Sequence, residues 1–246
     1  MITVLESIKL STEFLEKKGI ESPRINAELM LAKILNCKRL DLYLSFDRPL
    51  NENETDLYRE FIRRRSKFEP LQYILGSVEF YGMEFKVDKS VLIPRPETEI
   101  LVETILGSVE KNSSLNILDI GTGSGIIAVC LARYLPTSLI TATDSSESAL
   151  VVAKGNAELN GVGMQIDFKI SDILSDAENP ENQFDIIVSN PPYISVEEYQ
   201  KLAPELRLHE PQSALTDNSD GLNFFKIITG KSKVLLKRGG KLFFEV

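Results

Sequence analysis

Apolar residues in the first 70 positions recur every three or four residues, a spacing that predicts helices. The first helix places Leu5, Ile8 and Leu15 on one face, and Gly19 ends it. A second helix begins at Ser22-Pro23, because serine is a common N-cap and proline is favoured at the first helical position. We therefore expect Ser22 to cap that helix.

Two more helices are expected before residue 70. A short one covers residues 40–46, and a longer one follows. The longer helix carries its apolar face on Leu57, Phe61 and Phe68, with the triplet Arg63-Arg64-Arg65 mostly on the opposite face. We interpret the triplet as a solvated helix face rather than a phosphate site, because a run of like charge on a helix is usually solvated.

Past these helices the pattern changes to alternation. Met83 and Phe85 are separated by charged residues, which predicts a half-buried strand, and two glycines mark turns. We expect a small hairpin within residues 71–92. The segment Ile93-Pro94-Arg95-Pro96 must be extended, because each proline restricts the residue before it. A helix then runs from Glu97 to about residue 109.

Beyond residue 114 apolar strands alternate with amphipathic helices. The expected strands cover residues 116–118, 139–143, 166–170, 184–189 and 241–246. The expected helices cover residues 126–135, 146–160 and 221–236. This alternation predicts an α/β fold with a doubly wound, mostly parallel sheet. We divide the chain into a helical domain (1–70), a β-hairpin linker (71–92) and a Rossmann-like domain (93–246).

Composition places the chain among ordinary folded proteins. It has 246 residues, of which 43% are hydrophobic and 26% charged. We expect no membrane span, because no apolar run reaches the ~20 residues needed. The N-terminal residues look like neither a signal peptide nor a transit peptide, so we expect a cytoplasmic protein. Two distant cysteines and a single histidine argue against a zinc site.

The charge is unevenly distributed. Residues 1–75 carry 13 Lys and Arg against 12 Asp and Glu, whereas residues 76–246 carry 15 against 24. A nucleic-acid backbone is bound by clustered Lys and Arg. The acidic second part therefore argues against, without excluding, a nucleic-acid substrate.

A glycine-rich loop joins the first predicted strand of the parallel sheet to its helix. It reads Gly121-Thr122-Gly123-Ser124-Gly125 and follows Asp119. Glycines allow a tight turn and the close approach of a ligand to the backbone. Asp144 ends the next strand, where it can accept both hydroxyls of a ribose. The loop also fits a relaxed dinucleotide pattern, so both NAD and S-adenosylmethionine remain open, although the aspartate before three alternating glycines is more usual for the latter.

The tetrapeptide Asn190-Pro191-Pro192-Tyr193 follows directly on the predicted strand 184–189. At the carboxyl end of a strand in an open α/β sheet, it faces the ligand crevice. The prolines leave the carbonyls of Asn190 and Pro191 free as acceptors, and Tyr193 offers a flat face. This combination is a receptor for a planar NH₂ group.

The tetrapeptide resembles the signature of amino methyltransferases that use S-adenosylmethionine and act on adenine N6, cytosine N4 or glutamine N5. Further stretches extend the likeness over the whole chain. They are Ser22-Pro23-Arg24, Arg63-Arg64-Arg65, Glu69-Pro70-Leu71-Gln72-Tyr73, Glu79-Phe80-Tyr81-Gly82, Ile93-Pro94-Arg95-Pro96-Glu97-Thr98-Glu99 and Glu210-Pro211. With them the chain resembles the HemK/PrmC family of protein-(glutamine-N5) methyltransferases, which act on class I peptide chain release factors.

The resemblance implies a class I S-adenosylmethionine-dependent methyltransferase fold and roles for individual residues. The loop Gly121 to Gly125 would cradle the methionine part of the cofactor, and Asp144 would hold the ribose. Asp172 and Ile173 would flank the adenine, with aliphatic packing where many relatives have an aromatic residue. Asn190 to Tyr193 would hold the substrate glutamine, with Asn190 also next to the cofactor.

Three other residues are weighed for the site. Arg95 and Glu97 are expected to shape the substrate channel without an assigned contact. His209 is left out of the mechanism, because a lone histidine in a loop is usually a surface residue. We expect no general base and no metal, since the methylated amide loses its proton readily to water.

The family implies a product, S-adenosylhomocysteine, and a substrate, the glutamine of a Gly-Gly-Gln motif. We expect a monomer that contacts neither membrane nor nucleic acid directly and that docks its substrate on the N-terminal helices. Two alternatives stay open: adenine-N6 methylation of nucleic acid, and a module that binds the cofactor without chemistry. Family members continue past the last strand, so we expect C-terminal strands to be missing here.

Overall fold

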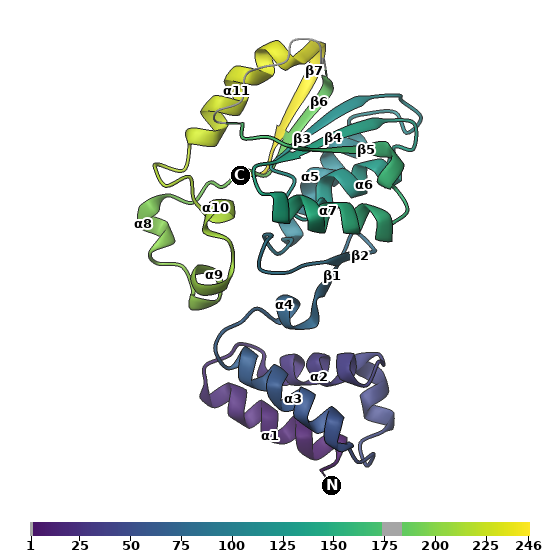
Figure 1. Ribbon diagram of the computed structural model, residues 1–246, viewed down its shortest axis with the longest axis vertical. Helices are drawn as coiled ribbons and strands as arrows, with labels where there is room; N and C mark the ends of the chain where they lie inside the picture. The colour runs from purple at the N-terminus through teal and green to yellow at the C-terminus, as the bar shows by residue number, and fades with distance from the viewer. Residues whose placement is uncertain (1, 174–183) are drawn as a thin grey trace. The chain divides into compact units, whose positions relative to one another are not determined.

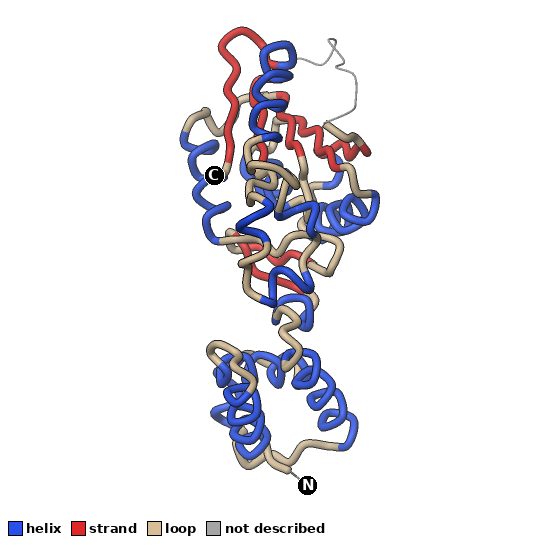
Figure 2. Tube along the Cα trace, turned by 90° about the vertical axis from the view of Figure 1, so that its left-hand side faces the viewer, coloured by secondary structure: helices blue, strands red, loops and turns tan. Residues whose placement is uncertain are grey.

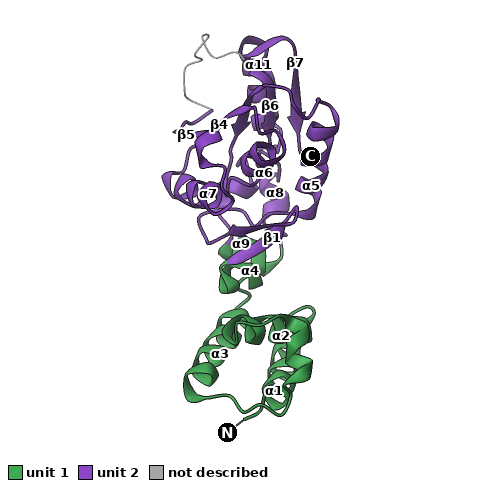
Figure 3. Ribbon diagram, turned by 90° about the vertical axis from the view of Figure 1, so that its right-hand side faces the viewer, with its two compact units in different colours: residues 1–76, 203–209 green, residues 77–202, 210–246 purple. Residues whose placement is uncertain are grey.

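The computed structural model describes residues 2–173 and 184–246. Figure 1 shows the order of helices and strands along the chain. The chain forms two compact units (Figure 3). The helical unit contains Met1–Gly76 together with Ala203–His209, and the sheet unit contains Ser77–Leu202 together with Glu210–Val246. Within the described residues, no helix is long and apolar enough to cross a membrane.

The helical unit is built from helices joined by short loops (Figure 2). Its elements are α1 (Val4–Lys17), α2 (Pro23–Ile34), the 3₁₀ helix η1 (Arg39–Leu44), α3 (Glu52–Arg65), α4 (Leu71–Leu75) and, far along the sequence, α9 (Pro204–His209). Buried side chains such as Leu15, Met30 and Leu31 form its own hydrophobic core. The predicted helices are therefore confirmed, and α4 and α9 are additions.

The start of α2 differs from the prediction. Pro23 occupies the first turn as expected, but Ser22 is left-handed (φ 48°) and its side chain makes no capping bond. Asn26 closes the turn instead, because its Nδ2 donates to the carbonyl oxygens of Glu21 and Ser22, each at 3.0 Å. These bonds hold the turn before α2, but they give no acceptor to the first amides of the helix, so the expected side-chain cap is absent.

The prediction of a solvated arginine triplet is wrong for two of its three residues. Arg65 is only 5% exposed and Arg64 is half-buried, whereas Arg63 is exposed. The reason is the phase of α3: its buried stripe is Tyr58, Ile62 and Arg65 at i, i+4 and i+7. Leu57, expected in the apolar face, is 42% exposed.

Each of the three nitrogens of the buried Arg65 guanidinium donates a hydrogen bond. It donates to Asn26 Oδ1 at 2.7 Å, to the Glu69 carbonyl oxygen at 2.9 Å and to Glu205 Oε2 on α9 at 2.9 Å. Its neighbour Arg64 donates to both carboxylate oxygens of Glu69, at 2.9 and 2.6 Å, and lowers the pKa of that carboxyl. A buried charge is tolerated when it is paired and hydrogen-bonded, which these contacts provide.

The sheet unit begins with the predicted hairpin, β1 (Ser77–Phe80) and β2 (Met83–Lys86), paired antiparallel. Five parallel strands follow: β3 (Asn116–Ile120), β4 (Leu139–Asp144), β5 (Ile166–Ile170), β6 (Phe184–Ser189) and β7 (Leu236–Phe244). Their order is β5-β4-β3-β6-β7, the doubly wound arrangement that the alternation predicted. β7 begins five residues earlier than expected. Its first residue, Leu236, pairs with Phe184 of β6, and the register of the two strands shifts between Phe184 and Ile186.

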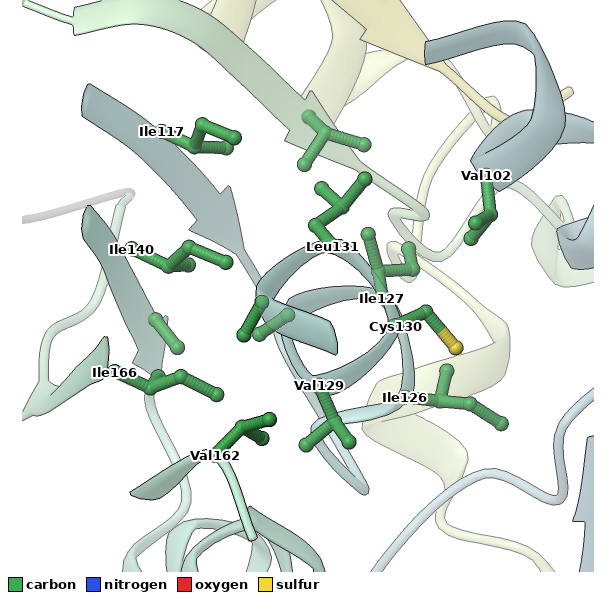
Figure 4. Close-up of a cluster of buried hydrophobic side chains, with 14 of the residues drawn as sticks. Val102, Ile117, Ile126, Ile127, Val129, Cys130, Leu131, Ile140, Val162 and Ile166 are labelled. Atoms are coloured by element: carbon green, nitrogen blue, oxygen red, sulfur yellow. The ribbon is translucent and has the colours of Figure 1, made fainter. Parts of the chain in front are cut away.

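Helices cover both faces of this sheet. On one face lie α5 (Pro96–Gly107), α6 (Ile126–Tyr134) and α7 (Glu147–Leu159), and on the other lies α11 (Asn223–Leu235). Figure 4 shows Ile117, Ile140 and Ile166 of three adjacent strands pointing toward α6. The short elements η2 (Gly163–Gln165), α8 (Val196–Tyr199) and α10 (Gln212–Leu215) complete the unit.

One glycine sets the packing of α6 against α7. Gly125 is the N-cap of α6, with φ +79°, and a Cβ there would lie 3.0 Å from Ala153 Cβ on α7. Only glycine satisfies both the left-handed conformation and the close approach. The last glycine of the loop thus brings the two helices together directly below the carboxyl edge of the sheet.

Candidate functional site

The predicted site residues gather at the carboxyl edge of the parallel strands, the usual ligand crevice of an open α/β sheet. A cavity of about 630 Å³ lies there, within the sheet unit. Such a volume is within the roughly 300–1,000 Å³ usual for cofactor sites. Ten predicted residues line it: Gly121, Thr122, Gly123, Ser124, Asp144, Asp172, Ile173, Asn190, Pro191 and Pro192. Gly125 and Tyr193 do not line it; Gly125 packs against α7, and Tyr193 is 43% exposed.

The glycine loop is fastened to the neighbouring strand by its backbone. The amides of Gly121 and Thr122 both donate to the carbonyl oxygen of Thr143 at 2.9 Å. Gly121, Gly123 and Gly125 all have positive φ, between 55° and 79°. The alternating glycines therefore allow a winding turn that residues with a Cβ would strain.

Asp144 links the loop to the helix that follows β4. Its Oδ2 accepts from the Gly123 amide and its Oδ1 from the Ser146 amide, each at 2.9 Å. A carboxylate oxygen has two lone pairs, so each oxygen retains capacity for one more donor. The carboxylate is thus held in place at the cavity wall and can still accept hydroxyl groups.

Asp119 is a residue that the sequence analysis treated only as part of a pattern. Its side chain is completely buried under the glycine loop. Oδ2 accepts from Thr122 Oγ1 at 2.6 Å, whereas Oδ1 has no hydrogen-bond partner among the described residues. Burial raises the pKa of Asp119 to about 7, and the nearby Asp144 carboxylate adds to the rise. The sequence did contain a signal for Asp119, because an acidic residue near the end of an apolar, buried strand needs a specific role.

The tetrapeptide begins where β6 ends. Asn190 is half-buried, and its Nδ2 lies 3.5 Å from Thr98 Oγ1 at the start of α5. Pro191 is buried. The structure brings Asn190, Pro191 and Pro192 into the lining of the cavity that the glycine loop and Asp144 also line.

The segment that follows the tetrapeptide, residues 194–196, is hydrogen-bonded to a second segment, residues 215–219. The Ile194 amide donates to Leu215 O at 3.0 Å, and the Val196 amide donates to Ser219 O at 3.2 Å. Gly221, with φ +81°, packs so closely that a Cβ there would collide with the Tyr193 carbonyl oxygen. This contact requires a glycine and fixes the exit of the tetrapeptide.

Asp217 keeps that second segment closed. Its carboxylate accepts from the backbone amides of Ser219, Gly221 and Asn223 at 2.8–3.0 Å. These bonds lower the pKa of Asp217, although partial burial opposes the shift. The sequence analysis did not single out Asp217 or Gly221, because their partners lie in a different segment.

Arg95 lines the cavity, held by a partner 115 residues away in the sequence. Its Nη2 donates to Glu210 Oε1 at 2.6 Å, and the Ile93 amide donates to Glu210 Oε2 at 3.2 Å. The Glu210 side chain is 2% exposed. Glu97 is exposed and does not line the cavity. His209 belongs to the helical unit, with Nε2 3.1 Å from the Lys67 carbonyl oxygen.

Several further lining residues were given no role in the sequence analysis. Among them are Thr98, Ser146, Pro211, Phe224 and Ile228. Phe224 and Ile228 lie one turn apart on α11, so this helix contributes an apolar wall. Among the described residues, no group of three His, Cys, Asp or Glu side chains is placed to hold a metal ion.

Comparison with known proteins gives two family models and close relatives. Residues 6–76 match the PrmC N-terminal domain, and residues 96–222 match the methyltransferase small domain. A release factor glutamine methyltransferase of Rhodopirellula baltica is 41% identical over 248 residues, which cover 99% of this chain and 83% of that protein. The chain belongs to the release factor glutamine methyltransferase family.

For other relatives, the match to this chain covers a smaller share of the relative's length. The protein of the same name from Fusobacterium nucleatum is 45% identical over 185 residues, 75% of this chain and 52% of that protein. The chain thus spans about half the length of that relative. A solved methyltransferase from Pyrococcus furiosus has a TM-score of 0.47 and 21% identity, covering 67% of this chain and 70% of that chain.

Proposed function

We propose that this protein transfers the methyl group of S-adenosylmethionine to the side-chain amide nitrogen of the glutamine in the Gly-Gly-Gln motif of class I release factors. The observation that carries the proposal is that Asn190 and Pro191 line the same cavity as the glycine loop and Asp144. The residues proposed to bind the substrate amide and those proposed to bind the cofactor therefore line one cavity. Membership of the release factor glutamine methyltransferase family supports the same reaction.

The residues of the cavity fit S-adenosylmethionine. Asp144 has free lone pairs for the ribose hydroxyls, and Asp172 with Ile173 lies at the end of the next strand, where the adenine would sit. The glycine loop leaves backbone room for the methionine part. When bound, the cofactor supplies an electrophilic methyl group on a sulfonium. Asp119, buried under the loop with a pKa raised to about 7, is not counted among the cofactor contacts.

Asn190 and Pro191 would orient the nucleophile. An amide nitrogen attacks poorly, because its lone pair is delocalised into the carbonyl. Acceptors that bind both N–H hydrogens, such as Asn190 Oδ1 and the Pro191 carbonyl, direct the remaining electron density at the methyl carbon. They also stabilise the positive charge that grows on nitrogen. Transfer would leave the methyl group on nitrogen and S-adenosylhomocysteine as the other product, and the nitrogen would lose its proton to water.

The substrate must be chosen by more than the amide pocket. A tetrapeptide that contacts one planar amide cannot distinguish a particular glutamine from others. We infer that the N-terminal helices dock a folded part of the release factor, which raises the effective concentration of its glutamine at Asn190. The charge balance supports this inference, since residues 1–75 are near neutral and the rest of the chain is acidic. We also propose that the protein acts as a cytoplasmic monomer. The acidity of residues 76–246 argues against direct contact with nucleic acid.

Mass spectrometry of a release factor after incubation with the protein and S-adenosylmethionine tests the reaction. One added methyl group on the glutamine of Gly-Gly-Gln is expected, and a factor with alanine at that position is the control. Methylation of adenine in DNA or RNA, with an unmodified factor, would overturn the proposal.

A comparison of substrates tests docking. The intact factor should be methylated with a much higher kcat/KM than a short peptide that contains the Gly-Gly-Gln sequence. Equal values for the two substrates would show that no second surface contributes.

A further inference from the structure

Asn190 has a neighbour that none of the motifs includes. β6 and β7 run parallel, with Ser189 opposite Phe244. Asn190 is the first residue after β6, and Glu245 is the first residue after β7. The Glu245 amide donates to the Ser189 carbonyl oxygen at 3.2 Å. The two residues leave the carboxyl ends of adjacent strands side by side.

The Glu245 carboxyl is buried and incompletely paired. The residue is 8% exposed, and Oε2 has no hydrogen-bond partner among the described residues. Burial raises the pKa of this carboxyl, and the adjacent Thr98 hydroxyl and Asn190 amide oppose the rise. A buried acid without a salt-bridge partner is costly, so it calls for a role.

An asparagine amide can lie either way round, with its oxygen or its nitrogen toward a given neighbour. An ionised carboxylate only accepts hydrogen bonds, so it faces the Nδ2 of an amide and repels the Oδ1. The Thr98 hydroxyl, 3.5 Å from Nδ2, can accept from the same side. With its nitrogen directed at these two groups, Asn190 presents Oδ1 to the cavity.

We propose that Glu245 is a positioning residue that fixes which way round the Asn190 amide lies, so that its oxygen is presented to the N–H hydrogens of the substrate amide. The inference rests on the proposed function, because an acceptor is needed there for an amide substrate. In the reversed orientation, Asn190 would offer two N–H groups to another NH₂ group and could not bind it.

The orientation depends on the ionisation of Glu245. When protonated, the carboxyl has an O–H that can donate to Asn190 Oδ1 and stabilise the reversed amide. Charged and titratable groups that act on Glu245 are Glu97, which raises its pKa, and Arg95, which lowers it; Glu245 in turn raises the pKa of Tyr193. Activity is therefore expected to decline as the pH falls through the pKa of Glu245, which lies above 4.5.

Methyl transfer to the release factor, measured against pH, gives the first test. The amide of Glu245→Gln can pair with the Asn190 amide in either orientation. We therefore expect kcat/KM of this variant near neutral pH to fall by about 10- to 100-fold. The decline in activity at acidic pH that is expected of the wild type, its acidic limb, should disappear. Glu245→Asp keeps a carboxylate and should keep the limb. The dissociation constant of S-adenosylhomocysteine should stay unchanged in both variants.

A matched control is Asp185→Asn, which removes a carboxylate from the opposite end of the same strand pair, where Asp185 contacts Lys237 at 2.7 Å. This variant should retain the acidic limb. An acidic limb that persists in Glu245→Gln, with folding and S-adenosylhomocysteine binding intact, would overturn the proposal.

A second measurement does not need activity. The side-chain NH₂ resonances of Asn190, assigned by their loss in Asn190→Ala, should shift with pH at the midpoint of the Glu245 titration in the wild type. Absence of that coupled shift overturns the role of Glu245, even if Glu245→Gln does not fold. A coupled shift in a protein that methylates no release factor would instead contradict the proposed substrate and leave the positioning role standing.

Discussion

Arg65 on α3 and Glu205 on α9 form an ion pair at 2.9 Å, although 140 residues separate them in the sequence. Together with the contact between His209 and the Lys67 carbonyl oxygen, the pair joins the short helix α9 to the rest of the helical unit. It also explains why Arg65 is buried, since α9 supplies the acceptor that its Nη2 requires.

Arg65→Ala should lower the free energy of unfolding by about 2–3 kcal/mol, because it leaves Asn26 Oδ1 and the Glu69 carbonyl without a donor. We place the value below that of a fully buried pair, since the Glu205 side chain is 34% exposed. Urea unfolding measures the loss. Arg63→Ala, two residues earlier and exposed, is the matched control and should change stability by less than about 0.5 kcal/mol. Equal effects of the two substitutions would contradict the assigned packing.

Asn190→Ala should reduce methyl transfer by about 10²–10³-fold, by analogy with the loss of one oriented donor from an oxyanion hole. Cofactor affinity is expected to remain, because it comes chiefly from the glycine loop and Asp144. Calorimetric titration with S-adenosylhomocysteine checks the second half. A large loss of affinity would show Asn190 to be primarily a cofactor ligand.

Asp144→Ala should act in the opposite way, weakening S-adenosylhomocysteine binding by at least about 10-fold, since each charge-assisted hydrogen bond contributes roughly 1.5–3 kcal/mol. The structure adds a second cause: the Gly123 and Ser146 amides lose their acceptor. Asp144→Asn keeps one acceptor oxygen and should bind more tightly than the alanine variant. Unchanged affinity in Asp144→Ala would place the ribose elsewhere.

Gly221→Ala is expected to lower kcat by about 10- to 100-fold, because its Cβ displaces the Tyr193 carbonyl and with it the tetrapeptide. Gly230→Ala on α11 is the control, since a Cβ there meets nothing within 4 Å and alanine favours a helix. Steady-state kinetics with both variants, alongside S-adenosylhomocysteine binding, makes the comparison. Full activity of Gly221→Ala would show that the close contact does not position the tetrapeptide.

Asp119 gives a prediction about stability and pH. In the unfolded chain it releases its proton near its ordinary pKa of 3.8, whereas in the folded chain burial holds the proton until about pH 7. The folded state therefore binds more protons between these values, and stability decreases as the pH rises through that window. Asp119→Asn removes this contribution, so its stability relative to the wild type should rise with pH by up to about 1.4 kcal/mol per pH unit. Thermal or urea unfolding across the window measures the difference, and a constant difference would mean that Asp119 is ionised throughout.

Local patterns predicted most of the sheet unit. Strands at 166–170 and 184–189 have the predicted bounds. The second is a short, buried, nearly continuous apolar run, whereas the first alternates apolar and charged residues and is mostly exposed or half-buried. The phase of α3 was mistaken, since Leu57 and Tyr58 compete for the same face and only packing against α2 decides between them: the Tyr58 hydroxyl donates to Ala27 O.

The site was predictable where one segment carries several of its groups, as in the glycine loop and the tetrapeptide. Thr98, Glu210 and Glu245 were not predicted, because each acts through a partner far away in the sequence. Such pairs are created by strand register and loop packing, which a linear pattern does not contain. The roles assigned to the cavity residues remain predictions.

The discontinuity of the helical unit has a consequence for recombination. The chain passes between the two units at residues 76–77, 202–203 and 209–210, so the helical unit is not a cassette that one splice point could transfer. A gene fusion that carried only its first 76 residues to another methyltransferase would leave the Arg65 guanidinium without its carboxylate. A chimera that keeps this ion pair would have to carry residues 203–209 together with residues 1–76.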